Sequence, residues 1–371
     1  MPEQVLVQRA EEEAAQGRHA AALELYARAW ESRHDEVAEK LLDLVEEWAD
    51  VDAALEVLQR TADQGVSGAY EALAALLVEI EEPEEALKAL QEAHERGREV
   101  TLWTAAVLSD ELDDREQAEV WYRRAIDASA AGALNDFGVF LSDDPERLVE
   151  AEEVLTLAVE RGDPMALGNL GRMHLEAERP EEALRWLRRG LDAGVRSVLV
   201  PMAEAEQQLG NFSEARAHLA EALDDEIEGA QLAWANFCAE YGTPDEQSAA
   251  EGEFLTALEQ EEVGAHFDYA VFLADRDRLD EAVEQYTAAA EEGEANAWLN
   301  LALIHEDRKD RRSAEECYRS GIDAGDLHAL LAYAEFLRQW GRQKDIPDLY
   351  DQAEALGANT DELAQLRTLA G

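Results

Sequence analysis

Small residues recur at a fixed spacing along almost the whole of this chain of 371 residues. The spacing is 32 residues, apart from one step of 33 and one of 35. A bulky residue follows each marker alanine by four positions and a small residue follows three positions later, as in Ala314, Tyr318 and Gly321. A period of about 20 to 50 residues is typical of stacked supersecondary units rather than of one globular core. The marker alanines are Ala22, Ala54, Ala86, Ala118, Ala151, Ala183, Ala215, Ala250, Ala282 and Ala314.

Each repeat contains two segments with helical periodicity, joined by a polar turn. In residues 295–326, Trp298 and Ala302 lie four positions apart on one helical face, and Ala314 and Tyr318 begin a second series of the same kind. Proline or acidic residues often open the second segment and glycine often follows it, which are start and stop signals of helices. Each unit is therefore expected to be a helix–turn–helix.

The motif that these positions form resembles the tetratricopeptide repeat and its Sel1-like relative. The clearest copy combines Ala166–His174 with Glu181–Gly190. A second copy, nearly as clear, combines Ala297–Ala302 with Ser313–Tyr318. One such motif is degenerate, but a series of them in register is specific.

This resemblance covers residues 3–358 and implies an all-α fold in one domain. The expected architecture is a right-handed superhelical α-solenoid of about eleven helix–turn–helix repeats. Residues 359–371 read as a C-terminal capping helix that covers the last apolar face. Pro201 falls inside the first helix of its unit, a position at which proline can kink a helix. The units are expected to start at residues 3, 35, 67, 99, 131, 164, 196, 231, 263, 295 and 327.

The charge of the chain limits its partners. Asp and Glu number 85 against 32 Lys and Arg, a net charge of −53. Such a surface repels phosphates, so we expect no direct nucleic-acid binding and no docking on an anionic membrane. It favours a basic partner, although a solvated surface, a high-salt cytoplasm or genome bias would each also produce acidity. With two cysteines, no secretory leader pattern and no long apolar run, a cytoplasmic protein is expected.

No catalytic constellation is visible in the sequence. Phosphate-cradling glycine loops, nucleophile elbows and zinc-binding helix motifs are all missing. His174, His305 and Cys238 occupy repeat positions that normally serve packing, so we interpret them as core residues. The chain is therefore expected to be non-enzymatic, with no cofactor and no metal site.

In proteins with this resemblance the first helix of each unit lines a concave groove. The implied groove positions are the second, fifth, ninth, twelfth and thirteenth of each unit. In the unit at 35 these positions form an acidic face. In later units they are apolar, which indicates either an interaction surface or a tightly packed superhelix. The groove candidates are Trp103, Asn135, Arg172, Leu232, Phe267, Val271, Leu299 and Leu303, and the acidic face is Glu36, Glu39, Asp43, Glu46 and Glu47.

Asparagine or aspartate recurs at one further repeat position, in Asn169, Asn236, Asn300 and Asp268. Some peptide-binding members of the family use such asparagines with cations to clamp a carboxylate, but here the neighbouring cations are mostly missing. A polar residue that bridges adjacent helices is the favoured interpretation.

Three functions remain open at this point. The first is an interaction scaffold that holds a basic or amphipathic protein segment in its groove. The second is an acidic decoy or inhibitor of a basic protein, such as a nucleic-acid-binding one. The third is a peptide-sensing regulator.

Overall fold

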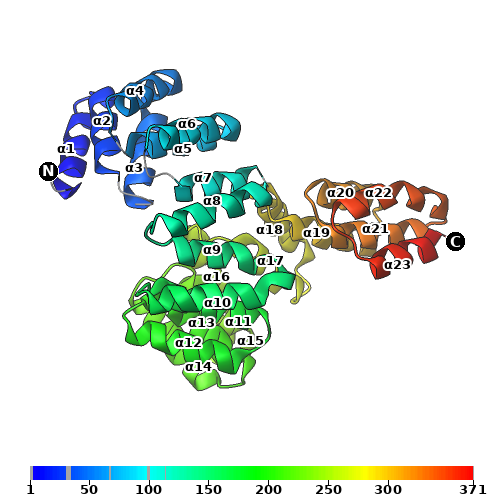
Figure 1. Ribbon diagram of the computed structural model, residues 1–371. Helices are drawn as coiled ribbons and strands as arrows, with labels where there is room; N and C mark the ends of the chain where they lie inside the picture. The colour runs from blue at the N-terminus through cyan, green and yellow to red at the C-terminus, as the bar shows by residue number, and fades with distance from the viewer. Residues whose placement is uncertain (1–2, 31–34, 67, 98–100, 113, 371) are drawn as a thin grey trace. The chain divides into compact units, whose positions relative to one another are not determined.

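The computed structural model describes residues 3–30, 35–66, 68–97, 101–112 and 114–370, without the side chains of residues 3, 4, 35, 36, 39, 101, 103, 110 and 111. These described residues form helices and no strand (Figure 1). The chain divides into two compact units, residues 1–173 and 174–371. The all-α prediction is confirmed, because every regular element within the described ranges is helical.

The first compact unit contains the helices up to the boundary inside α11. Their bounds are α1 Glu3–Ala14, α2 His19–Ala29, α3 Asp35–Trp48, α4 Val51–Asp63, α5 Gly68–Glu79, α6 Pro83–Glu95, α7 Thr101–Ala106, η1 Val107–Glu111, α8 Arg115–Asp127, α9 Ala133–Ser142, η2 Pro145–Arg147, α10 Leu148–Glu160 and α11 Met165–Glu176. The turn η1 continues α7 as a π-helix.

The second compact unit follows the same alternation of first and second helices. Its bounds are α12 Pro180–Asp192, η3 Arg196–Val198, α13 Leu199–Gln208, α14 Phe212–Asp224, α15 Ala230–Tyr241, α16 Pro244–Glu259, α17 Ala265–Ala274, α18 Leu279–Glu291, α19 Ala295–Asp307, α20 Arg311–Asp323, α21 Leu327–Gln339, η4 Gln343–Leu349, α22 Tyr350–Ala355 and α23 Thr360–Ala370.

Consecutive helices pack in pairs, and the repeated small residues lie where the pairs meet. In the second compact unit, α15 packs on α16, α17 packs on α18, and α19 packs on α20. The marker Ala314 is fully buried, and Tyr318 four positions later is 1% exposed. Gly321 on α20 allows this helix to approach α21 closely, because a Cβ at Gly321 would lie 2.8 Å from the Cβ of Ala329. These contacts confirm the α-solenoid, whereas the count of eleven units, the single domain and the right-handed sense stay predictions.

Pro201 does not interrupt a helix. The short 3-10 turn η3 precedes α13, which begins at Leu199, so Pro201 is the third residue of the α-helix. An amide N–H in the first turn has no partner within the helix, and proline therefore removes no bond there. The predicted kink is wrong, because the unit was expected to start at residue 196 and its α-helix begins only at Leu199.

Helix α23 closes the chain as the predicted cap. Its start is held reciprocally, because the Asn359 side chain accepts bonds from the amides of Asp361 and Glu362 at 2.9 and 3.1 Å, and the Glu362 side chain accepts one from the amide of Asn359 at 2.7 Å. Leu366 and Leu369 are buried against the last core cluster, which includes Ile346 and Leu337. The closing helix thus covers apolar surface that the preceding helices leave open.

Candidate functional site

The ninth position of several predicted units reaches the surface in the first helices, although Val107 at this position is buried. Leu303 on α19 is 48% exposed and Val271 on α17 is 37% exposed, although both are large apolar residues. Glu335 on α21, Val139 on α9 and Arg172 on α11 are also exposed. The three exposed residues at this position on α17, α19 and α21 of the second compact unit are called the ninth-position row: Val271, Leu303 and Glu335.

Other apolar candidates belong to the core. Leu232 is buried at 9% exposure. Phe267 is half-buried and its ring lies 5.6 Å from that of Tyr286 in an edge-on arrangement. Leu299 is half-buried against the last core cluster. The two interpretations of the apolar stretch therefore apply to different residues: Leu232, Phe267 and Leu299 pack, and Val271 and Leu303 are exposed and free to make contacts.

The recurrent polar position links neighbouring helices in two cases, whereas Asn300 donates to the Asn296 carbonyl of its own helix at 3.2 Å. The Asn236 amide on α15 donates to the carboxylate of Asp268 on α17 at 2.5 Å. In the first compact unit, the Asn169 side chain donates to the amide oxygen of Asn135 at 2.7 Å and accepts a bond from Arg172 at 2.6 Å. The groove candidates Asn135 and Arg172 are thus brought together through Asn169, and their polar groups bond to one another.

Part of the acidic face lies on α3. Asp43, Glu46 and Glu47 are exposed there. The side chains of Glu36 and Glu39, and that of the groove candidate Trp103, fall outside the described residues.

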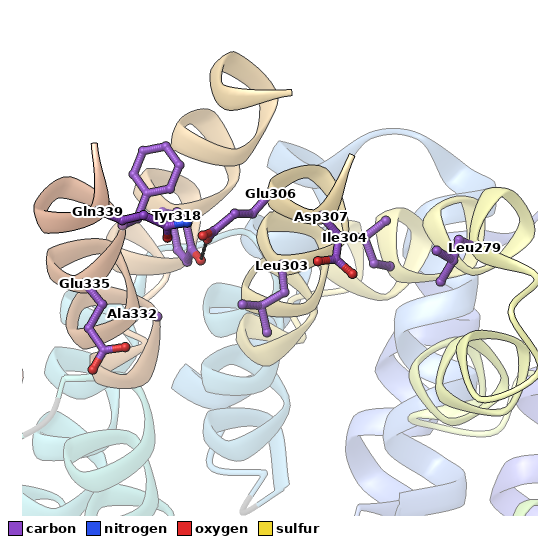
Figure 2. Close-up of a pocket in the computed structure, with 10 residues that line it drawn as sticks. Leu279, Leu303, Ile304, Glu306, Asp307, Tyr318, Ala332, Glu335 and Gln339 are labelled. Atoms are coloured by element: carbon purple, nitrogen blue, oxygen red, sulfur yellow. Dashed lines mark hydrogen bonds between the residues drawn. The ribbon is translucent and has the colours of Figure 1, made fainter. Parts of the chain in front are cut away.

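A pocket of about 400 Å³ opens between the first helices α19 and α21 (Figure 2). Five of its ten lining residues occupy the ninth, twelfth or thirteenth position of their units. Figure 2 shows Leu303 on one helix facing Ala332 and Glu335 on the other. The pocket, here called the α19–α21 pocket, is lined by Leu279, Leu303, Ile304, Glu306, Asp307, Tyr318, Ala332, Glu335, Phe336 and Gln339.

The α19–α21 pocket combines apolar walls with three carboxylates and no cationic lining residue. The Tyr318 hydroxyl donates to Oε2 of Glu306 at 2.9 Å, which orients this carboxylate. Burial and that hydrogen bond raise the pKa of Tyr318, so the hydroxyl remains a donor at neutral pH. The site is suited to a group that is cationic at one end and apolar along its length.

Residues with possible catalytic or metal-binding chemistry lie apart. His174 is buried, and His266 bonds to Gln285 at 2.7 Å. Burial raises the pKa of the Cys238 thiol to about 11 and that of Cys317 to about 11, which suppresses thiolate reactivity. Within the described part of the chain no three His, Cys, Asp or Glu side chains are grouped to hold a metal ion.

Two segments match the tetratricopeptide repeat family, residues 165–198 and 295–324. These segments contain the two clearest copies of the motif in the sequence. The second segment also supplies five lining residues of the α19–α21 pocket: Leu303, Ile304, Glu306, Asp307 and Tyr318. These matches support the predicted resemblance to tetratricopeptide and Sel1-like repeat proteins.

Several solved structures are similar to this chain in fold. Yeast Tom70 is 13% identical over 99% of this chain and 94% of its own, with a TM-score of 0.57. The human IFIT1 dimer with PPP-AAAA is 13% identical over 95% and 93%, with a TM-score of 0.52. The protective antigen c5321 of uropathogenic Escherichia coli, described as having an SLR fold, is 15% identical over 99% and 91%, with a TM-score of 0.41. No curated protein matches the sequence significantly.

None of the helices in the described ranges has both the length and the apolar character needed to cross a bilayer.

Several pocket residues were not singled out from the sequence. Glu306, Asp307, Glu335 and Gln339 occupy groove positions, so the repeat register was enough to find them. The repeat pattern identifies Tyr318 only as a packing residue of the second helix. Its hydroxyl reaches the groove through Glu306, and the sequence period carries no signal of that contact.

Proposed function

We propose that this protein is a non-enzymatic interaction scaffold whose first helices hold a basic or amphipathic protein segment. The tetratricopeptide fold suggests protein–protein interaction, and a row of first helices offers an extended surface to a peptide or helix.

The observation that carries the proposal is the composition of the α19–α21 pocket. Half of its lining is made by groove positions, and the lining joins apolar surface with Glu306, Asp307 and Glu335. Exposed Leu303 and Val271 add apolar contact area along the ninth-position row. An acidic, apolar surface attracts a segment of opposite charge that also presents apolar side chains.

RNA is a poor ligand for such a surface. Human IFIT1 was solved with PPP-AAAA, but a triphosphate needs cationic groups to neutralise it. This chain has a net charge of −53 and a pocket lined by carboxylates. The proposal therefore takes a protein segment, and not a nucleic acid, as the partner.

The proposal is tested with two labelled peptides, one alternating leucine with arginine and one alternating leucine with glutamate. Fluorescence anisotropy at near-physiological salt should show binding of the first peptide alone. The double variant Val271→Ser, Leu303→Ser should weaken that binding about tenfold, since two apolar contacts are worth roughly 1.4 kcal/mol or more. Phe267 and Leu299 are unsuitable for this test, because their substitution would also disturb the core.

The matched control is Leu255→Ser, Val263→Ser. These residues are 47% and 90% exposed and lie outside the first-helix rows, on α16 and in the turn before α17. Equal binding by both double variants, or equal binding of both peptides, would show that the ninth-position row is not the binding surface.

A decoy function for a basic protein is the second candidate, because Asp43, Glu46 and Glu47 are exposed together on α3. Binding by such a surface depends on long-range attraction and should be lost in molar salt. Changing these three residues to Asn, Gln and Gln should remove it. If a basic protein is still captured in molar salt and by the triple variant, the decoy function is rejected and the scaffold function remains.

A further inference from the structure

Three carboxylates of the α19–α21 pocket have no cationic partner in the described part of the chain. Glu306 bonds to Tyr318, and Glu335 accepts a bond of 3.4 Å from Gln365. No described Arg or Lys pairs with Glu306, Asp307 or Glu335. The site therefore concentrates negative charge beside apolar walls.

Two arginines close to the pocket in sequence are engaged elsewhere, whereas Lys309 and Arg338 are exposed beside it and do not pair with its carboxylates. Arg308 pairs with Asp280 at 2.8 Å. Arg311 lies over the ring of Trp340, with its guanidinium carbon 3.2 Å from the ring centroid. None of these cations forms an ion pair with a carboxylate of the pocket.

We infer that the α19–α21 pocket receives the side chain of one arginine or lysine of the partner segment. This inference rests on the proposed function and deepens it. The aliphatic stem of the side chain packs on Leu303 and Ile304, and its charged end bonds to Glu306 and Glu335. Glu306 is suited to this contact, because Tyr318 holds one of its oxygens and leaves the other to accept.

The form of the pocket favours a side chain of a longer chain over a free cation. Sites for small molecules enclose about 70 to 90% of the ligand surface. Here Leu303 is 48% exposed, and Asp307, Glu335 and Gln339 are exposed as well. A free amine would keep most of its surface in water, whereas a peptide gains affinity from contacts on either side of the pocket.

The test uses a labelled peptide of leucine and serine with one central arginine, and its counterpart with citrulline, which keeps the shape and removes the charge. The variants are Glu306→Gln and Glu335→Gln. The matched control is Glu291→Gln, an exposed carboxylate on α18 outside the pocket. Binding is measured by anisotropy, and circular dichroism checks that each variant is folded.

We expect Glu335→Gln and Glu306→Gln each to weaken binding of the arginine peptide about tenfold, and Glu291→Gln to change it less than about twofold. The citrulline peptide should bind wild type about tenfold more weakly and should show no further loss on Glu335→Gln. Equal effects of Glu335→Gln and Glu291→Gln would overturn the inference. Binding of spermidine as tight as that of the arginine peptide would also overturn it, in favour of a free polyamine site.

Failure of this inference is distinguishable from failure of the scaffold. If the arginine and citrulline peptides bind equally but Val271→Ser, Leu303→Ser still weakens both, the groove remains and the arginine pocket is rejected. If no peptide binds the wild-type protein, both proposals fail.

Discussion

At the scale of single residues, the repeats are joined by a recurring ion-pair arrangement. A glutamate directly after a marker alanine pairs with an arginine at the start of the next second helix. The arginine also pairs with an acid three residues after it. The pairs are Glu119 with Arg147 at 2.8 Å, Glu251 with Arg278 at 2.7 Å and Glu315 with Arg342 at 2.7 Å, and the further acids are Glu150, Glu281 and Asp345.

The pair of Glu119 and Arg147 is the best test of this arrangement. It is bidentate, with distances of 2.8 and 3.0 Å, and both side chains are only 20 to 25% exposed. Arg147→Gln and Glu119→Gln should each cost about 1 kcal/mol of unfolding free energy. The double variant should cost less than the sum, because the bond between these two side chains is lost only once. Urea unfolding of the four proteins measures this coupling, and strict additivity would contradict it.

The same pair predicts a pH dependence. The hydrogen bond from Arg147 lowers the pKa of Glu119 below its usual 4.5. A lowered pKa contributes stability that is complete above pH 4.5 and is lost as pH falls through the folded-state value. The stability difference between wild type and Arg147→Gln should therefore be constant at neutral pH and shrink below about pH 4. A difference that grows in acid would contradict this assignment.

At the scale of elements, small residues set how closely paired helices approach. Gly138 lies on α9, where an added Cβ would lie 2.5 Å from Cγ of the buried Leu155. Gly138→Ala should cost about 1 to 2 kcal/mol, because the clash exceeds the helix-propensity gain. Gly252 on α16 has no atom within 4 Å of such a Cβ, so Gly252→Ala should stabilise by about 0.5 to 1 kcal/mol. Unfolding midpoints that shift in the same direction would refute this account.

Helix α23 is predicted to protect the last repeat locally. Leu366 is fully buried, so Leu366→Ala should cost about 3 kcal/mol in that region. Each unit of a solenoid contacts only its neighbours, so hydrogen exchange should accelerate in α21 and α23 and remain unchanged in α13 and α14. The control Arg367→Gln, at an exposed position of the same helix, should leave exchange unaltered. Acceleration throughout the second compact unit would indicate longer-range cooperativity.

At the scale of the whole molecule, the period of the sequence predicts the helical elements well and the site only in part. The marker alanines and their partners identify the helices because small residues can occupy the crowded contacts. Burial within the groove positions could not be predicted, because Phe267 and Val271 are both apolar groove candidates and differ only in what packs on them. The α19–α21 pocket likewise depends on which residues distant in sequence line the same space, such as Leu303 and Glu335.

The net charge of −53 is a property of the whole chain and predicts how its stability depends on salt. Carboxylates outnumber cations so strongly that most cannot pair, and their mutual repulsion opposes the compact state. Salt reduces the screening length from about 10 Å at 0.1 M to about 3 Å at 1 M, which weakens repulsion between exposed charges more than it weakens close bidentate pairs. We therefore expect the melting temperature to rise by several degrees between these concentrations of sodium chloride. The variant with Asp43, Glu46 and Glu47 changed to Asn, Gln and Gln should melt higher at low salt and gain less from added salt. A melting temperature that falls with salt would mean that ion pairs such as Glu119 with Arg147 outweigh the repulsion.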